Sequence, residues 1–156
     1  MTERIVALRG WFEGLGGPEP RELSVDPEGR VAEEGDRSPS GALAEYGEGC
    51  RIRPGEVNAH SHPEQSVYTE LVDPSWDLAT WCRHTIYRRS VEMTPELVYL
   101  GCCRAFGRML LAGVTTVAVS FYCHNRRSND LDRQVIRAAR TTGIRLLFGR
   151  MYYDWV

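Results

Sequence analysis

The stretch PGEVNAHSH, residues 54–62, marks the point at which the character of the sequence changes. A proline–glycine pair, typical of a turn, precedes a short run that suits a β-strand from Val57 to His60. One residue separates His60 from His62, and side chains alternate along a strand, so both are expected to point to the same side. The stretch therefore predicts two neighbouring imidazoles at the C-terminal end of a strand.

Helical patterns follow this stretch. Residues 76–89 suit one helix, and residues 94–112 suit a second, in which Thr94 can cap the first N–H groups and Pro95 fits the first turn. Gly113 suits the left-handed end of this helix. Its apolar stripe is expected to contain Val98, Cys102, Ala105, Met109 and Ala112.

Further strands alternate with these helices. VTTVAVSFY, residues 114–122, is apolar and β-branched, which is typical of a strand buried on both faces. A helix capped by Ser128 or Asn129 and ended by Gly143 comes next, and IRLLFG, residues 144–149, begins another strand. Strands that alternate with helices predict an α/β fold with a parallel sheet or barrel.

Residues 1–53 have a different pattern. RIVALRGWF suits a strand, GLGGPEP at residues 14–20 suits a turn or loop, and RELSVDPEGRVAE at residues 21–33 suits a hairpin. The polar segment at 33–41 is expected to be a loop. We therefore predict two parts, a small β unit at 1–53 and an α/β part at 54–156.

The composition narrows the class of protein. The 156 residues carry a net charge of −2 and are 42% hydrophobic, which favours a soluble globular protein over a dedicated nucleic-acid binder. No apolar run approaches the ~18 residues of a membrane span. The number of cysteines is odd and none form a C-x-x-C pair, which favours the reducing cytoplasm over a disulfide framework.

Two imidazoles at a strand end form half of a site for a divalent metal, with zinc the first candidate. Asn58 and Ser61 could hold the rings through hydrogen bonds. An H-x-H pattern also occurs by chance in many proteins, where the histidines are ordinary surface or capping residues. From the pattern alone, both interpretations stay open.

PGEVNAHSH resembles the opening metal motif of the amidohydrolase superfamily, except that Glu56 replaces the usual apolar residue. Residues 81–122 are similar to the segment between the first and second barrel strands in its aminohydrolase branch, which includes chlorohydrolases, deaminases and formimidoylglutamate deiminases. Residues 141–154 resemble the third strand of the same enzymes. The resemblance implies the first three strands of a TIM-type (β/α)8 barrel, preceded by part of a small β-sandwich.

This resemblance also implies a function, namely a metal-dependent hydrolase of non-peptide C–N bonds of the deaminase or deiminase type. Such an enzyme would use a metal-activated water to attack a small amidine-like or heterocyclic amine substrate. His60 and His62 would hold the metal. By similarity to formimidoylglutamate deiminases, Gln65, Tyr122 and His124 would contact the substrate. The alternative for these three is that they are ordinary polar loop residues.

The family's remaining metal ligands and its proton-transferring aspartate come from later strands, which have no counterpart here. We therefore expect no catalytic residue within the chain, which would be the inactive N-terminal portion of an enzyme. A second chain, or a homo-oligomer, would complete the barrel. The alternative is a catalytically inactive remnant or an interaction subunit.

Overall fold

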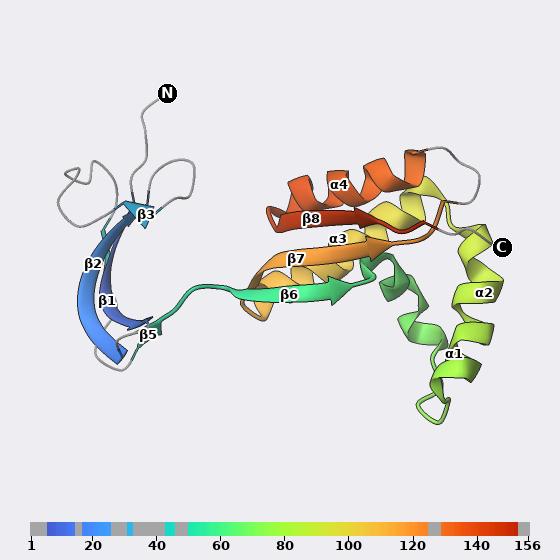
Figure 1. Cartoon of the computed structure of the whole chain (residues 1–156), viewed down its shortest axis with the longest axis horizontal. Coiled ribbons are helices and arrows are strands. Elements are labelled where there is room, and N and C mark those ends of the chain that lie inside the picture. The colour runs from blue at the N-terminus through green and yellow to red at the C-terminus, as the bar shows by residue number, and fades with distance from the viewer. Residues whose placement is uncertain are drawn as a thin grey trace. The chain divides into compact units, whose positions relative to one another are not determined.

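The computed structural model describes residues 50–124 and 129–152 in full, together with the backbone of four strands within residues 6–45. The chain divides into two compact units, Met1–Pro54 and Gly55–Val156. Figure 1 shows strands in the first unit and alternating strands and helices in the second.

The first unit contains one sheet. Its strands are β1 (Val6–Gly14), β2 (Gly17–Val25), β3 (Val31–Ala32), β4 (Leu43–Glu45) and β5 (Arg51–Ile52). β2 pairs antiparallel with β1 and with β3, whereas β4 and β5 run parallel to β1. The pairing of β2 with β3 confirms the predicted hairpin, although its turn at 26–30 and the predicted loop at 33–41 lie outside the described residues.

The predicted loop at residues 14–20 is largely wrong, because residues 17–20 belong to β2 and pair with β1. Pro18 and Pro20 lie opposite Glu13 and Trp11. Their spacing of two lets both rings occupy positions at which a backbone N–H would point away from β1. Pairing between strands thus overrides the turn preference of a glycine- and proline-rich segment.

The second unit is built on a parallel sheet. Its strands are β6 (Glu56–Ser61), β7 (Val114–Phe121) and β8 (Arg145–Arg150), in the order β6-β7-β8. Helix α3 (Pro95–Leu111) precedes β7, and helix α4 (Asp130–Thr142) connects β7 to β8. This arrangement confirms the predicted α/β fold with a parallel sheet, of the kind found in part of a β/α barrel.

Local sequence signals set the ends of both helices. The Thr94 hydroxyl accepts a hydrogen bond from the Leu97 N–H at 3.2 Å, as a cap does. Gly113 and Gly143 follow α3 and α4 with φ values of +85° and +83°, a conformation that glycine adopts without steric cost. Asn129 is the N-cap residue of α4, without a side-chain cap bond.

The core lies between these helices and one face of the sheet. β7 contributes Val117, Val119 and Phe121, which are at most 2% exposed. Buried side chains of α3 and α4 also contribute, among them Val98, Cys102, Phe106, Leu131 and Val135. Phe106 replaces Ala112 in the predicted stripe of α3, since Ala112 is exposed at the helix end.

The other face of the sheet differs from the sequence-based expectation, which buried residues 114–122 on both faces. Val57 lies opposite Thr116, and Leu147 lies opposite Ala118, so these residues share that face. Val57 is 66% exposed and Leu147 is 68% exposed. The apolar strand β7 therefore has one face in the core and one half-buried face, whose neighbours Val57 on β6 and Leu147 on β8 are exposed.

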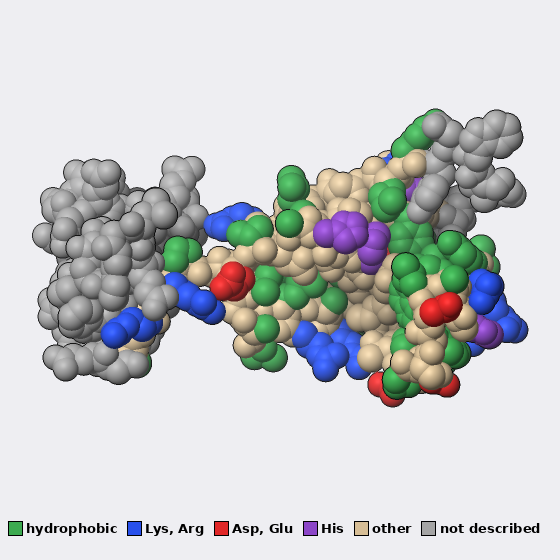
Figure 2. All heavy atoms as spheres, turned by 60° about the horizontal axis from the view of Figure 1, so that its bottom comes forward, with side chains coloured by type: hydrophobic (Ala, Val, Ile, Leu, Met, Phe, Trp, Pro, Cys, Tyr) green, Lys and Arg blue, Asp and Glu red, His purple; other side chains and the backbone are tan. Residues whose placement is uncertain are grey.

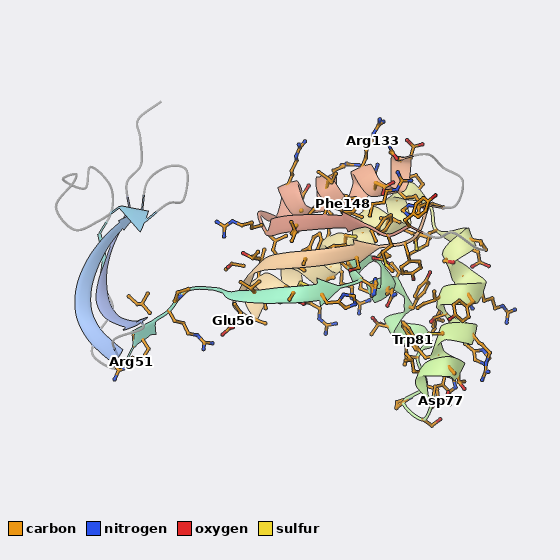
Figure 3. All side chains as sticks on the ribbon, viewed as in Figure 1. Arg51, Glu56, Asp77, Trp81, Arg133 and Phe148 are labelled. Atoms are coloured by element: carbon orange, nitrogen blue, oxygen red, sulfur yellow. The ribbon has the colours of Figure 1, made fainter. Side chains whose placement is uncertain are left out.

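Four short helices connect β6 to α3. They are η1 (Pro63–Leu71), α1 (Leu78–His84), α2 (Ile86–Arg89) and η2 (Ser90–Glu92). Asp77 and Trp81, labelled in Figure 3, mark the start and the middle of α1. Thr85 divides the single helix predicted at 76–89, since its backbone departs from the helical conformation with φ of −111° and ψ of −80°. Its side chain is buried, and its hydroxyl donates to the Trp81 carbonyl. Across the described residues, no helix combines the length and the apolar character that crossing a bilayer requires.

Candidate metal centre

The first parallel strand, β6, contains His60 and an irregularity, and His62 follows the strand as the N-cap residue of η1. Asn58 lies opposite Val117 and Ser61 lies opposite Val119, so three steps on β6 match two steps on β7. Such a β-bulge changes the direction in which nearby side chains point. The Asn58 side-chain oxygen accepts a hydrogen bond from the His60 N–H at 3.1 Å, which supports the bulge.

The start of β6 explains the proline–glycine pair and the unusual glutamate. A Cβ atom at Gly55 would collide with the Thr115 side chain, so glycine allows the close approach of β7. Glu56 is exposed at the first position of β6, at the opposite end of the strand from the histidines (Figure 3). The departure from the family motif therefore lies away from the imidazoles.

The two imidazoles lie side by side, although His62 lies one residue beyond β6 and the bulge interrupts the regular alternation of side chains. Their ring centroids are 4.8 Å apart, with an edge-to-face angle of 89°. Figure 2 shows histidine side chains that reach the surface of this unit. Both rings approach Ser120 on β7: His62 Nδ1 is 2.5 Å from the Ser120 carbonyl oxygen, and His60 Nδ1 is 3.3 Å from the Ser120 hydroxyl oxygen.

The surroundings of His62 keep its ring neutral at pH 7. Burial lowers the pKa of His62 below 6.5, the hydrogen bond to the Ser120 carbonyl raises it in part, and the adjacent His60 lowers it further. A carbonyl oxygen accepts but never donates, so the neutral ring carries its proton on Nδ1. Nε2 of His62 then keeps the lone pair that a metal ligand needs.

Two further predicted residues lie beside the pair. The Tyr122 ring is 5.5 Å from the His62 ring, and the Gln65 amide donates a hydrogen bond to the Tyr122 hydroxyl at 3.1 Å. Burial, with smaller contributions from Cys123 and Glu64, raises the pKa of Tyr122 well above its usual value. Gln65 and Tyr122 therefore place neutral hydrogen-bonding groups next to His62.

His124 has different neighbours. Its Nε2 is 2.9 Å from the Met151 carbonyl oxygen, and its Nδ1 is 3.7 Å from an Asp132 oxygen. The centroid of its ring is 5.9 Å from that of the Phe121 ring in the core. The structure thus brings together Gln65, Tyr122 and the histidine pair. His124 takes part in a second cluster that joins the segments following β7 and β8.

Glu64, in the first turn of η1, is a buried carboxyl group two residues after His62. Its side chain is 0% exposed, and within the described residues neither carboxyl oxygen has a hydrogen-bond partner. Burial raises its pKa to about 8. In sequence it lies in a polar stretch typical of a loop, and no local signal indicates that the turn of η1 directs it inward.

The donor set matches half of a zinc site. Structural zinc sites commonly have four protein ligands and catalytic sites three. Two imidazoles with free Nε2 atoms are suitable ligands, and their Nδ1 atoms have the supporting contacts that metal-bound histidines usually make. In the parts of the chain that are described, no three His, Cys, Asp or Glu side chains come together as a metal site.

Comparisons with known proteins place the chain in a family. The model of the amidohydrolase family matches residues 51–155. The 5-methylthioadenosine/S-adenosylhomocysteine deaminase of Syntrophobacter fumaroxidans is 29% identical over 107 residues, which cover 69% of this chain and 22% of the relative. The chain therefore spans about a fifth of the length of the curated relatives that it matches.

Solved structures show the same fold. E. coli guanine deaminase superposes with a TM-score of 0.70 at 18% identity, and the match covers 97% of this chain and 38% of the guanine deaminase chain. A zinc-bound adenosine deaminase from Xanthomonas campestris has a TM-score of 0.62 at 18% identity, covering 91% and 33%. These structures support the fold, and the family model covers more than half of the sequence. The chain belongs to the amidohydrolase family.

Proposed function

We propose that this chain is the N-terminal part of a metal-dependent hydrolase that cleaves non-peptide C–N bonds, a deaminase or deiminase. The observation that carries the proposal is the pair of imidazoles at the end of β6, with their Nδ1 atoms at Ser120. Parallel β/α folds place catalytic groups at this end of their strands. Family membership supports the same chemistry.

His60 and His62 would hold a divalent metal through Nε2, with zinc the first candidate. When bound, such a metal lowers the pKa of a coordinated water to about 7 and so supplies a nucleophile. The zinc in the Xanthomonas campestris adenosine deaminase supports this choice. The lowered pKa of His62 favours the neutral form of the ring, so protons compete less with a metal.

The substrate in this proposal is a small heterocyclic amine or amidine. Gln65 and Tyr122 offer neutral donors and acceptors beside His62, which suits uncharged ring nitrogens and amino groups. Relatives named as deaminases of adenosine derivatives and of guanine support this substrate class. His124 stays a prediction as a substrate contact, since its ring is engaged with Met151 and Asp132.

Proton transfer would depend on residues supplied by a second chain or by a homo-oligomer, and the chain alone is expected to be inactive. The cytoplasmic assignment is also part of this proposal and rests on the cysteine content. The alternative is a catalytically inactive remnant or an interaction subunit.

Zinc titration tests the metal assignment. Tag-free protein is titrated with Zn²⁺ against a chromophoric chelator, and His60→Gln, His62→Gln and His84→Gln are compared. His84 stacks on Trp76 at 4.7 Å and is the matched control. We expect the first two variants to lose at least about tenfold in affinity, with His84→Gln unchanged.

Two results would contradict the metal assignment. One is wild-type protein that binds no zinc, which would favour the inactive alternative. The other is binding that survives loss of either strand histidine, which would place the metal elsewhere in the chain.

A further inference from the structure

Ser120 lies on β7, directly beside His60 of β6 and beside His62, which follows that strand. Its carbonyl oxygen is 2.5 Å from His62 Nδ1, and its hydroxyl oxygen is 3.3 Å from His60 Nδ1. The two contacts join residues that are 58 and 60 positions apart in sequence. One residue of the neighbouring strand therefore approaches the same nitrogen of both rings.

The two acceptor atoms of Ser120 have different chemistry. The carbonyl oxygen only accepts, and it belongs to the backbone, so it selects the Nδ1–H form of His62 whatever side chain stands at position 120. The hydroxyl oxygen has two lone pairs and can accept from Nδ1–H of His60. In that arrangement Nε2 of both rings carries a lone pair and is available to one cation.

Parallel pairing gives Ser120 its position. Val119 lies opposite Ser61, and Ser120 lies opposite Gly149 of β8, so this residue is held between strands on both sides. Its side chain is partly buried. A rigid strand of this kind restricts ring rotation better than a loop residue would.

We propose that Ser120 is a positioning residue that orients both imidazoles and fixes their tautomers for metal binding. The inference rests on the proposed function for the identity of the ligand. The orientation of the rings is a property of the metal-free protein and is measured separately. Loss of the hydroxyl should affect His60 alone, because the carbonyl contact of His62 persists.

The first measurement uses nitrogen NMR of ¹⁵N-histidine-labelled, metal-free protein at a pH where the rings are neutral. We expect His62 to carry its proton on Nδ1 in wild type and in Ser120→Ala. The Nδ1–H fraction of His60 should fall in Ser120→Ala and recover in Ser120→Thr, which retains a hydroxyl. Thr116→Ala is the control, because Thr116 lies on the same strand and its hydroxyl accepts from Arg145 at 3.3 Å.

The second measurement is zinc affinity of the same four proteins. Ser120→Ala should bind about tenfold more weakly than wild type, the usual effect of losing a group that supports a metal ligand. Ser120→Thr and Thr116→Ala should bind as wild type does. Melting temperatures identify any variant that loses affinity through unfolding.

The outcomes separate this inference from the proposed function. A wild-type chain without zinc affinity defeats the metal proposal, whereas the NMR tautomers still decide the role of Ser120. A His60 tautomer ratio that is unchanged or higher in Ser120→Ala overturns the positioning role. The role is equally overturned if Thr116→Ala changes the His60 ratio or the zinc affinity as much as Ser120→Ala does.

Discussion

The His62 side chain shows how one residue acquires metal-ligand character from its surroundings. Partial burial removes water from the ring and penalises its charged form. The Ser120 carbonyl then selects which nitrogen keeps the proton. The Ser120 contact comes from a residue 58 positions away in sequence.

The first prediction is that His62 titrates below 6.5 in the folded protein. Desolvation is the main cause, and the neighbouring His60 adds to it, whereas the Ser120 hydrogen bond opposes both. Because the folded-state pKa is depressed, the stability contributed by His62 is present above the unfolded pKa and is lost as the pH falls. Ring-proton NMR between pH 5 and 8 measures the midpoint, about 6.5 for an unperturbed ring.

The His62→Gln variant assigns the resonance, and His84 serves as an internal reference from another part of the unit. A His62 midpoint at or above 6.5 would contradict the prediction, since 6.5 is the value for an unperturbed ring.

At the scale of elements, helix α3 approaches η1 closely at a glycine. The Ser66 hydroxyl donates to the Gly101 carbonyl at 2.6 Å. A Cβ atom at Gly101 would lie 2.8 Å from a Val67 methyl carbon and 3.0 Å from the Glu64 carbonyl oxygen. This contact holds the segment that follows the histidines against the core helix.

The second prediction is therefore that Gly101→Ala destabilises the protein by about 1–3 kcal/mol, the usual cost of overpacking. Gly107 is the matched control in the same helix, because a Cβ there would meet nothing within 4 Å. Gly107→Ala should stabilise by about 0.4–1 kcal/mol. Urea unfolding followed by circular dichroism at 222 nm measures both, and equal effects of the two variants would refute the close contact.

The segments that follow β7 and β8 meet at a buried carboxylate. Asp132 of α4 has a 7% exposed side chain and lies 3.6 Å from Arg150 Nε and 3.7 Å from His124 Nδ1. Arg150 also donates to the Asn129 side-chain oxygen at 2.7 Å. This cluster joins the start of α4 to the C-terminal ends of two strands.

The third prediction is that Asp132→Ala lowers the free energy of unfolding by an intermediate amount. Loss of an exposed ion pair costs up to about 1 kcal/mol, and loss of one partner of a buried pair costs about 3–5 kcal/mol. The expected value is intermediate because Asp132 is buried whereas Arg150 is 47% exposed. Asp130→Ala, an exposed acid in the same helical turn, is the control. The comparison again uses urea unfolding, and a loss no larger than that of Asp130→Ala would show that the cluster adds no stability.

For the whole molecule, the buried Glu64 links global stability to pH. The folded protein retains the Glu64 proton up to a pKa of about 8, whereas the unfolded chain releases it near 4.5. The unfolded state therefore binds fewer protons between these values. Stability contributed by Glu64 is greatest below the lower value and is lost as the pH rises.

The fourth prediction is that the free energy of unfolding of wild type, relative to Glu64→Gln, falls between pH 5 and 8. The slope is at most about 1.4 kcal/mol per pH unit for one group. Glu70→Gln is the control, because Glu70 belongs to the same η1 segment and its side chain is 82% exposed. Urea unfolding at a series of pH values gives the difference, and parallel curves for wild type and Glu64→Gln would contradict the burial of an ionisable carboxyl group.

Some predictions from sequence succeeded for a physical reason. The ends of α3 are set by residues close to them in sequence, Thr94 and Pro95 at the start and Gly113 after the end. Their effect is therefore visible in the sequence alone. The division at Thr85 was not visible, because a buried threonine ends a helix that its neighbours would otherwise continue. Residues 17–20 were mistaken for a loop because their strand character comes from pairing with β1.

The sequence by itself determined the α/β order of elements, the ends of α3 and the nearness of the two imidazoles, because periodicity, caps and chain proximity act over a few residues. Family motifs in residues 54–62 added the expected chemistry. Only the tertiary structure decided the contacts of Ser120 with both rings, the burial of Glu64 and the contacts of His124 with Met151 and Asp132. Those features depend on pairing and packing between distant segments, for which no local pattern exists.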